Sequence, residues 1–393
     1  MKKSGIEIYR NIIKNKNVHV PERIQFQFSY DYSPKIDLKG NDPKSERNLK
    51  FIDSTTSECV HESTLKPGHF TSLFRRWFTP WLVQGYDREN KVWSLDFEST
   101  LFGGKILVSI DSSSLGDTIA WLPVIDQLRK KYKAQLIVTT FWNEIMSHFF
   151  PQIKFSHPGF RDPSANAVFG VGWYEEDDRN IHRRDPRSIS LQQVAGDLIG
   201  VEVNSDILPS QIPGWLETTK SRFEGKYVCI GTESTANAKH WHYPRGWQTL
   251  VNYLKSIGYE VVVIHSQQNT LDGVVDKTGT IDMTDRMIDL YHADFFVGIG
   301  SGLSWLAWAL RKPVVMVSGF SSPHCEFSHL NYRVINRGVC HGCFNDVRHK
   351  FDRGDWNWCP RLKNTERMFE CTTQITPDMV ISKIQNLISE QKL

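Results

Sequence analysis

The chain of 393 residues is long enough for two or three domains, each with a hydrophobic core. Its 40% hydrophobic and 23% charged residues are typical of a soluble protein, and its net charge of +3 is too small to indicate nucleic acid as the main partner. Residues 1–17 lack the apolar stretch of a secretory signal, and no segment approaches the roughly 18 apolar residues of a membrane helix. We therefore expect a cytoplasmic protein without a membrane span.

Residues 1–102 have the pattern of a small β-rich domain, either a sandwich or a barrel. Apolar and polar residues alternate over 23–30, 48–52 and 91–97, which predicts half-buried antiparallel strands. Proline, glycine, asparagine and aspartate lie between these segments and predict turns. The aromatic and basic segment 74–81 is either interior packing of this domain or a surface for an acceptor or partner.

Residues 103–213 alternate between strand and helix patterns and predict a first Rossmann-like domain on the acceptor side. The apolar segment 106–110 predicts a buried parallel strand, and a polar loop follows at 111–117. Apolar residues then recur every three or four positions as far as Tyr132, as in an amphipathic helix. The remaining predicted elements are strands at 134–139 and 167–172, a helix that carries Ile145, Phe149 and Phe150, and a helix at 190–200.

The loop at 111–117 carries two carboxylates at the carboxyl end of a predicted strand, where open α/β sheets bind ligands. Asp111 and Asp117 are therefore candidates for acid–base catalysis. The alternative is that Ser114 and Asp117 only cap the helix that follows. The loop alone does not decide between these two interpretations.

Residues 214–338 repeat the alternation and predict a second Rossmann-like domain. The predicted strands are 227–231, 260–266, 295–299 and 313–319, and the predicted helices are 246–254, 287–291 and 303–310. Two successive halves of this kind predict a cleft between them. The last segment, 373–393, is predicted to form a C-terminal helix.

A glycine-rich turn in the second half is a candidate phosphate site. The segment 298–303 does not match G-x-G-x-x-G, because Leu303 stands at the last glycine position. It nevertheless lies between a predicted strand and a predicted helix, with Gly300 just before the helix. The backbone N–H groups of Ser301, Gly302 and Leu303 would then be free to hold a phosphate. The alternative is that the glycines only permit a tight turn.

A second loop at the end of a neighbouring strand carries hydroxyls and a lysine. A hydroxyl and a lysine near an anion-binding helix start are typical of a diphosphate clamp, although Lys239 alone would more often be a surface lysine. The donor-side candidates in this loop are Thr232, Glu233, Ser234 and Lys239. Weaker donor-side candidates, which could equally be solvated, are Gln268 and Arg286.

Four of the seven cysteines are clustered near the C-terminus and predict a metal finger over residues 339–372. The clustered cysteines are Cys340, Cys343, Cys359 and Cys371, and the first two form a C-x2-C knuckle. In a chain without a secreted disulfide framework, such an array is more typical of metal binding than of disulfides. Four thiolates suit zinc or iron, leave no open position for catalysis, and would hold an irregular loop together.

The C-terminal three quarters of the chain resembles the heptosyltransferases of GT-B fold. The loop 113–117 followed by Leu122-Pro123 is similar to the motif around that family's general-base aspartate, which implies this role for Asp117. Thr232 and Lys239, followed by Trp241, resemble the donor-diphosphate motif, and 301–304 resembles the family's D-T-G-L-S-H motif. This sequence departs from the last motif, because Gly300 stands at the aspartate that helps to bind the donor's heptose, and Trp305 stands at the histidine.

The cysteine cluster, the β-rich front domain and the loop at 110–117 together resemble one branch of this family, the bacterial autotransporter heptosyltransferases. The resemblance implies transfer of heptose from ADP-heptose to serines in the passenger domain of an autotransporter adhesin. It further implies iron rather than zinc in the finger and a homo-oligomer of twelve subunits. Asp111, one residue after the strand, stays a second candidate for the base.

The resulting hypothesis is a GT-B-type pair of Rossmann-like domains that binds ADP on the second half and inverts the transferred sugar. Lys239, Thr232 and the N–H groups at 301–303 would neutralise the leaving diphosphate, so no catalytic divalent metal is expected. One alternative is a lipopolysaccharide-core heptosyltransferase with a lipid-sugar acceptor. Another is a metal-finger interaction or nucleic-acid module without catalysis, which the small net charge and the acidic stretch 175–178 disfavour.

Overall fold

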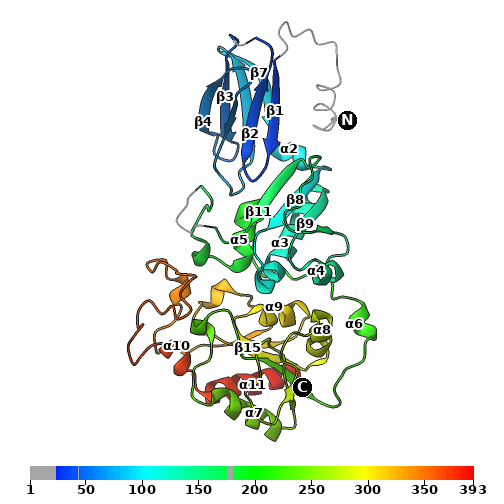
Figure 1. Cartoon of the computed structure of the whole chain (residues 1–393), viewed down its shortest axis with the longest axis vertical. Helices are drawn as coiled ribbons and strands as arrows, with labels where there is room; N and C mark the ends of the chain where they lie inside the picture. Colours follow the sequence, from blue (N-terminus) through cyan, green and yellow to red (C-terminus); the bar gives the residue numbers. More distant parts are fainter. Residues whose placement is uncertain (1–23, 43, 175–179) are drawn as a thin grey trace.

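The computed structural model of the chain describes residues 24–42, 44–174 and 180–393 (Figure 1). The β-rich part lies at one end, the first α/β half lies in the middle, and the second α/β half lies at the other end (Figure 1). The basic N-terminal residues 1–17 and the acidic stretch 175–178 lie outside the described residues. Within the described part, no helix is long and apolar enough to cross a membrane.

The β-rich part is a sandwich of two antiparallel sheets. One sheet has the order β1-β2-β5 and the other the order β4-β3-β6-β7. The strands are β1 (Gln25–Tyr30), β2 (Pro34–Lys39), β3 (Arg47–Asp53), β4 (Glu58–Leu65), β5 (Phe70–Ser72), β6 (Trp81–Asp87) and β7 (Asn90–Asp96). The sheets pack face to face, with the rings of Phe26 and Trp93 stacked at 5.0 Å. Gly85 admits this contact, because an added Cβ would lie 2.7 Å from the Phe26 ring.

The first α/β half is a four-stranded parallel sheet with the order β10-β9-β8-β11. Its elements are β8 (Lys105–Ile110), α3 (Leu115–Tyr132), β9 (Gln135–Thr139), α4 (Asn143–Phe149), β10 (Lys154–Ser156), β11 (Ala167–Val171) and α5 (Leu191–Ile199). The helix α2 (Phe97–Leu101) joins the sandwich to this half. Strand β8 is buried because helices and the sandwich cover it, which explains its unbroken apolar run.

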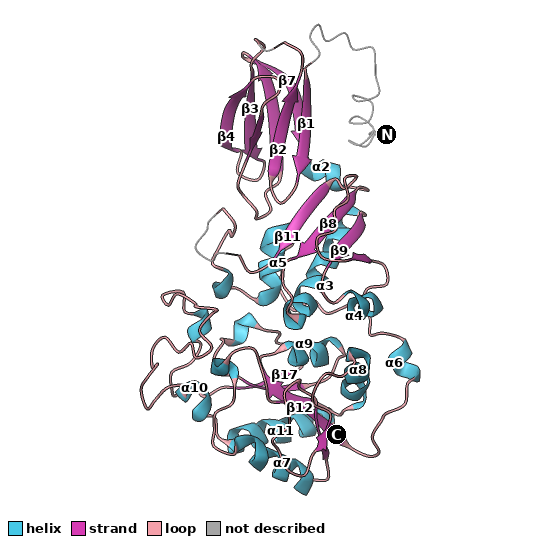
Figure 2. Cartoon of the chain, in the orientation of Figure 1, coloured by secondary structure: helices cyan, strands magenta, loops and turns pink. Residues whose placement is uncertain are grey.

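The second α/β half is a six-stranded parallel sheet with the order β14-β13-β12-β15-β16-β17. Its strands are β12 (Tyr227–Gly231), β13 (Glu260–Val263), β14 (Val275–Asp276), β15 (Phe296–Ile299), β16 (Val314–Val317) and β17 (Asn331–Val334). Its helices are α7 (Gly246–Ser256), α8 (Met283–His292), α9 (Gly302–Ala309) and α11 (Pro377–Gln391), and α6 (Trp215–Thr218) precedes it. Strands and helices alternate in both halves (Figure 2).

The predicted α/β fold class and the β-rich N-terminal part are confirmed. The structure adds strands that the sequence analysis did not predict, and the reasons differ. Strand β4 is mostly exposed and polar, whereas β10 and β14 are edge strands of two or three residues. In the aromatic segment 74–81, Trp81 is fully buried and packs inside the domain, while the Phe74 side chain is 60% exposed; a role for the segment as an acceptor or partner surface stays a prediction.

The cysteine-bearing segment 339–372 is mostly irregular. Its regular pieces are a short 3-10 helix (Cys343–Asn345) and the first residues of α10 (Glu370–Thr373). A small cluster that includes Phe320, Cys343 and Trp358 packs inside it. The segment lies beside the second half, on the side of α10 (Figure 1).

Candidate active site

The first turns of α3 and α9 meet where the two α/β halves contact one another. A Cβ added to Gly116 would lie 3.4 Å from the Cα of Gly302 and 3.2 Å from Cδ1 of Trp305. A Cβ added to Gly302 would lie 3.2 Å from Cβ of Leu115. Glycine is therefore needed on both sides of the contact. It brings the loop after β8 next to the loop after β15.

Asp117 lies in the first turn of α3, where the backbone N–H of Asp117 donates to the Ser114 hydroxyl of the N-cap. Its carboxylate does not serve as that cap. Oδ2 accepts a hydrogen bond of 2.7 Å from the Ser112 hydroxyl and one of 3.1 Å from the indole N–H of Trp173. Capping therefore falls to Ser114, and the carboxylate of Asp117 is left available for chemistry.

Opposing influences set the pKa of Asp117. Burial is the largest and raises the pKa, whereas the hydrogen bond from Ser112 and then the charge of Lys239 lower it. The charge of Arg353 also lowers it, more weakly. Lys239 belongs to the second half and Arg353 to the cysteine-bearing segment. The half-buried carboxylate therefore lies within electrostatic reach of both, and its pKa is above the ordinary value for aspartate.

Asp111 lies in a different environment, on the side of the first half that adjoins the sandwich. Its Oδ1 accepts from the Ser109 hydroxyl at 2.7 Å, and its Oδ2 accepts from the Tyr174 hydroxyl at 2.7 Å. Burial and then the charge of Asp111 raise the pKa of Tyr174. The guanidinium of Arg76 stacks on the Tyr174 ring at 4.8 Å. Asp111 is thus held by first-half side chains close to the sandwich, while the charges that act on Asp117 belong to the second half and to the cysteine-bearing segment.

The start of α9 provides backbone donors and a buried hydroxyl. Ser301 is the N-cap of α9, but its side chain makes no capping hydrogen bond, and its Oγ is buried without a partner among the described residues. The first turn of α9 contains no acidic residue of its own. This is the environment that a phosphate oxygen would satisfy.

The loop after β12 lies against the turn after β15. The Ser234 hydroxyl donates to the carbonyl of Gly300 at 3.5 Å, and the backbone N–H of Ser234 donates to Nε2 of His240 at 3.2 Å. Thr232 is buried, and its hydroxyl donates to the carboxylate of Glu233 at 3.2 Å. The structure therefore brings together the predicted residues at 232–234, at 300–303 and at 239.

A cavity of about 180 Å³ opens beside this loop. Its lining residues include Thr232, Glu233, His240, His265 and Asn269. His265 is buried, and its Nδ1 has no partner among the described residues. Burial lowers the pKa of His265, so the ring is neutral near pH 7. The cavity is polar and adjoins the candidate diphosphate residues.

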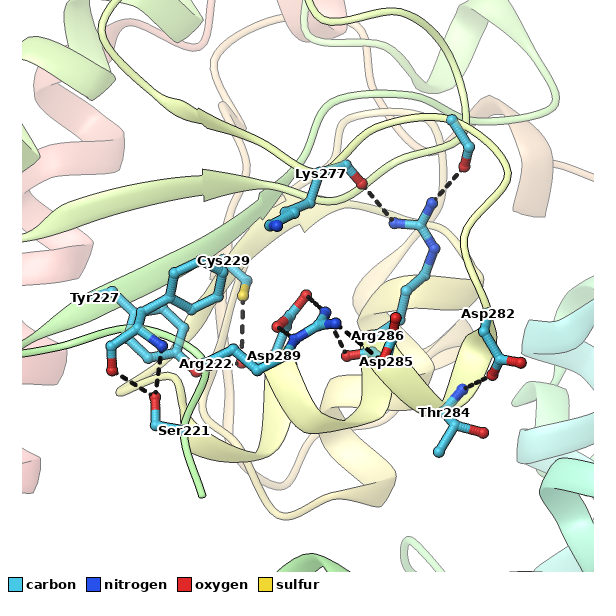
Figure 3. Close-up of polar contacts among 12 residues, drawn as sticks. Ser221, Arg222, Tyr227, Cys229, Lys277, Asp282, Thr284, Asp285, Arg286 and Asp289 are labelled. Carbon is cyan, nitrogen blue, oxygen red and sulfur yellow. Dashed lines mark hydrogen bonds and ion pairs between the residues drawn. The ribbon is translucent and has the colours of Figure 1, made fainter. Parts of the chain in front are cut away.

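The two weaker donor-side candidates adjoin residues that line this cavity, because Gln268 precedes Asn269 and Arg286 contacts the backbone of His265. Gln268 is exposed in the loop after β13. Arg286 is buried in α8, and its guanidinium donates to the carbonyl of Lys277 at 3.4 Å (Figure 3). It also donates to the carbonyls of Gly279 at 2.6 Å and of His265 at 3.4 Å. Arg286 therefore holds the loops on either side of β14.

A carboxylate from another element fills the space beside Gly300. A Cβ added there would lie 2.6 Å from Oε1 of Glu326. The other oxygen of Glu326 pairs with Arg333 and accepts a hydrogen bond from the Ser321 hydroxyl at 3.2 Å. The family resemblance predicts an aspartate at this position, but Gly300 has no side chain. Glu326, 26 positions later in the sequence, supplies the negative charge there instead.

The four clustered cysteines line one small cavity of about 20 Å³. Sγ of Cys340 and Sγ of Cys343 lie 3.7 Å apart, close to the roughly 3.8 Å expected for two thiolates on one tetrahedral ion. Burial, and then the charges of the neighbouring thiolates, raise the pKa of Cys343 and Cys371 to about 12. Even so, the described residues contain no group of three or more His, Cys, Asp or Glu side chains arranged to hold a metal, so the structure does not itself show the predicted metal finger.

The sequence analysis did not identify Trp173, Arg353 or Glu326. Trp173 follows β11, so its place at the carboxyl edge of the first sheet was a usable signal. Arg353 is 180 positions from Trp173 yet donates to its carbonyl at 3.2 Å, and no local pattern indicates such a contact.

Comparisons with known proteins agree with this geometry. The family described as glycosyltransferase family 9 (heptosyltransferase) matches residues 203–348. The chain is 34% identical to the autotransporter heptosyltransferase TibC of Escherichia coli O78:H11, over 89% of this chain and 88% of TibC. It is 34% identical to the autotransporter heptosyltransferase Aah of Escherichia coli, over 88% of this chain and 90% of Aah. The structure of dodecameric, iron-containing TibC in complex with ADP-D-β-D-heptose matches with a TM-score of 0.83 at 29% identity, covering 93% of this chain and 96% of that one.

Proposed function

The chain belongs to the autotransporter heptosyltransferases of glycosyltransferase family 9, and on that premise we propose that it transfers heptose from ADP-heptose to serine hydroxyls of an autotransporter passenger domain. The observation that carries the proposal is that the first turn of α3, which holds Asp117, packs against the start of α9, where the Gly116 and Gly302 backbones meet. The charge of Lys239, on the second half, also acts on the carboxylate of Asp117. A base and a cation on opposite sides of a cleft are what transfer from a diphosphate donor requires.

The donor's diphosphate lies at the second half, and its leaving charge is neutralised there. Lys239 provides a positive charge, Thr232 a hydroxyl, and Ser301 a buried hydroxyl at the start of α9. The N–H groups at 301–303 add the positive end of the helix dipole. These groups make a catalytic divalent metal unnecessary in the proposal.

Asp117 acts as the general base. Its hydrogen-bond donors, Ser112 and Trp173, both contact Oδ2, so Oδ1 is the oxygen that receives the proton. The serine oxygen attacks the anomeric carbon as its proton passes to Asp117. The bond from that carbon to the phosphate oxygen breaks, and ADP leaves with the electron pair. A single displacement of this kind inverts the anomeric configuration. Its raised pKa makes Asp117 a better base than an exposed aspartate.

The four clustered cysteines hold a structural iron ion in this proposal, with zinc as the alternative. Support comes from their convergence on one cavity and from the iron-containing TibC relative. Thiols whose pKa is raised by burial and by neighbouring thiolates ionise readily only when a cation binds them. We further propose a dodecamer, by analogy with TibC, and a cytoplasmic location, which the seven unpaired cysteines favour.

Incubation of the protein with ADP-heptose and a passenger domain tests the proposed function. We expect the acceptor's intact mass to rise in steps of one heptose, with the sites on serine. A parallel reaction with a lipopolysaccharide-core acceptor distinguishes the lipid-sugar alternative. Metal analysis of the same sample distinguishes iron from zinc. If neither acceptor gains mass while ADP-heptose stays intact, the proposal is wrong.

A further inference from the structure

The segment Val339–Trp358 carries two of the clustered cysteines, and it also contacts the first α/β half. Arg187, which is only 2% exposed, donates through Nη1 to the carbonyl of His349 at 2.6 Å. In return, the side-chain amide of Asn345 donates to the carbonyl of Arg187 at 2.5 Å. A buried guanidinium bonded to backbone carbonyls fixes the position of both partners. The segment therefore bridges the two halves.

The same segment contacts the residue that donates to Asp117. The ring of Phe344 meets the ring of Trp173 edge to face at 6.1 Å, and Nη1 of Arg353 donates to the Trp173 carbonyl at 3.2 Å. The indole N–H of Trp173 in turn donates to Oδ2 of Asp117 at 3.1 Å. A chain of contacts thus runs from the cysteine-bearing segment to the carboxylate.

We propose that the segment Val339–Trp358 positions the catalytic carboxylate: Phe344 and Arg353 hold Trp173, and Trp173 aims Asp117 into the cleft. The catalytic role of Asp117 in this inference rests on the proposed function, whereas the contacts of Phe344, Arg353 and Trp173 do not depend on it. Trp173 and Arg353 are positioning residues. They orient Asp117, and no contact with a substrate is needed for their role.

The physical basis is the small number of groups that fix Asp117. Only Ser112 and Trp173 donate to its carboxylate among the described residues, and Trp173 is half-buried. Its ring touches Trp121 of α3 on one side, at 6.3 Å, and Phe344 on another. Removing the contacts from the segment leaves the indole supported only by the first half. The carboxylate then has more freedom to turn.

Arg353 also affects the electrostatics of the site. The charged groups that act on Asp117 are Lys239, from the short 3-10 helix Asn237–Lys239, and Arg353. Both lower its pKa, against the larger effect of burial. Losing Arg353 should therefore raise the pKa of Asp117. The acid limb of the kcat profile should then move to higher pH.

The test compares Arg353→Met with Arg348→Met in the full-length protein. Both variants lose one positive charge from the same segment, but Arg348 is 78% exposed and pairs with Asp346 rather than contacting Trp173. We expect Arg353→Met to move the acid limb of kcat upward by about half a pH unit and to lower kcat about threefold, with KM for ADP-heptose unchanged. Arg348→Met should behave as the wild type.

Trp173→Phe is the second variant, because it keeps a six-membered aromatic ring near Phe344 and removes the N–H donor together with the five-membered ring of the indole. We expect kcat to fall about tenfold, with unchanged affinity for ADP alone. Hydrogen exchange of the amides at 112–117, measured without substrate, supplies a readout that does not depend on activity. Exchange should be faster in Arg353→Met and Trp173→Phe than in Arg348→Met.

The outcomes separate this inference from the proposed function. Absence of heptose transfer by the wild type overturns the function, while the exchange measurement still decides whether the segment positions Asp117. Equal exchange at 112–117 in Arg353→Met and Arg348→Met overturns the positioning inference, even if the wild type is fully active. A matching change in melting temperature in both arginine variants confirms that any difference between them is local.

Discussion

The carboxyl edge of the first sheet and that of the second contain different kinds of groups. On the first, Asp117 is half-buried and held by side chains, and burial raises its pKa. On the second, backbone N–H groups at the start of α9, a buried hydroxyl and Lys239 are available. A raised carboxylate pKa suits uptake of a proton, whereas N–H groups and a lysine suit an anion. The two edges thus carry the groups that the two halves of the proposed transfer reaction would require.

Replacing Asp117 tests the acceptor edge and has the largest expected effect. Asp117→Asn cannot accept a proton, so we expect kcat to fall about a thousandfold, measured as heptose transferred to the passenger domain. Asp111→Asn loses only hydrogen bonds to Ser109 and Tyr174, so a fall of less than about tenfold is expected. The reverse ranking would assign the base to Asp111 and remove the distinction between the two edges.

Replacing Lys239 tests the donor edge and the electrostatic link between the edges. We expect Lys239→Met to lower kcat/KM for ADP-heptose about a hundredfold, because a charged contact to the diphosphate is lost. Since the charge of Lys239 lowers the pKa of Asp117, the acid limb of the rate profile should also move to higher pH. Lys226→Met is the control, because this exposed lysine precedes β12 at the opposite edge of the sheet. A variant with weaker donor binding and an unmoved acid limb would show that the two edges act independently.

Adding one methyl group tests the contact that joins the edges. In Gly302→Ala the new Cβ would meet Leu115 Cβ at 3.2 Å and the Gly116 nitrogen at 3.3 Å, so the two halves must shift apart. We expect a loss of about 1–2 kcal/mol in the free energy of unfolding, measured by denaturant titration. Gly214→Ala is the control, because nothing lies within 4 Å of its added Cβ and its φ of −62° suits alanine. Equal stabilities of the two variants would mean that the halves are not tightly joined there.

The smallest expected effect concerns pH and a histidine of the donor edge. Burial, and then the charge of His240, lower the pKa of His242 from 6.5 to about 4. The unfolded chain takes up a proton near pH 6.5 and the folded chain only near pH 4. The stability that His242 contributes is therefore present above pH 6.5 and lost as the pH falls toward 4.

His242→Gln should accordingly reduce the fall in melting temperature between pH 7 and pH 4.5 by a few degrees or less. The exposed His157 provides the control, since His157→Gln should leave the dependence on pH unchanged. If the melting temperatures of the wild type and of His242→Gln fall equally with pH, the titration of His242 does not contribute to the pH dependence of stability.

The regular part of the fold could be predicted because its patterns are local. Strand β8 is a run of apolar residues, and α3 places apolar residues every three or four positions. Each of these patterns therefore predicts its element without reference to the rest of the chain. Strands β10 and β14 could not be predicted, since two or three residues carry no periodicity and their pairing depends on a neighbouring strand. The same limit applies to the face-to-face packing of the sandwich, in which Gly85 and Phe26 meet across 59 positions.

The candidate site divides in the same way. Asp117 and Lys239 follow predicted strands, and sheet topology alone places them at carboxyl edges. Trp173 and Arg353 become relevant only because the cysteine-bearing segment folds back onto the first half. Glu326 likewise occupies the space beside Gly300 only in three dimensions. Residues of this second kind depend on tertiary contacts, which no single-sequence pattern contains.

The contact between Gly116 and Gly302 has an electrostatic consequence that should differ between the protein without nucleotide and the protein with nucleotide bound. Two helices point their positive ends at one another there, and only α3 has a negative side chain, Asp117, in its first turn. The repulsion between the two dipoles weakens the joint until an anion arrives beside α9. On the proposed function, a bound nucleotide diphosphate would add negative charge at this joint, so ADP alone should raise the melting temperature, and its departure should loosen the halves for the next donor.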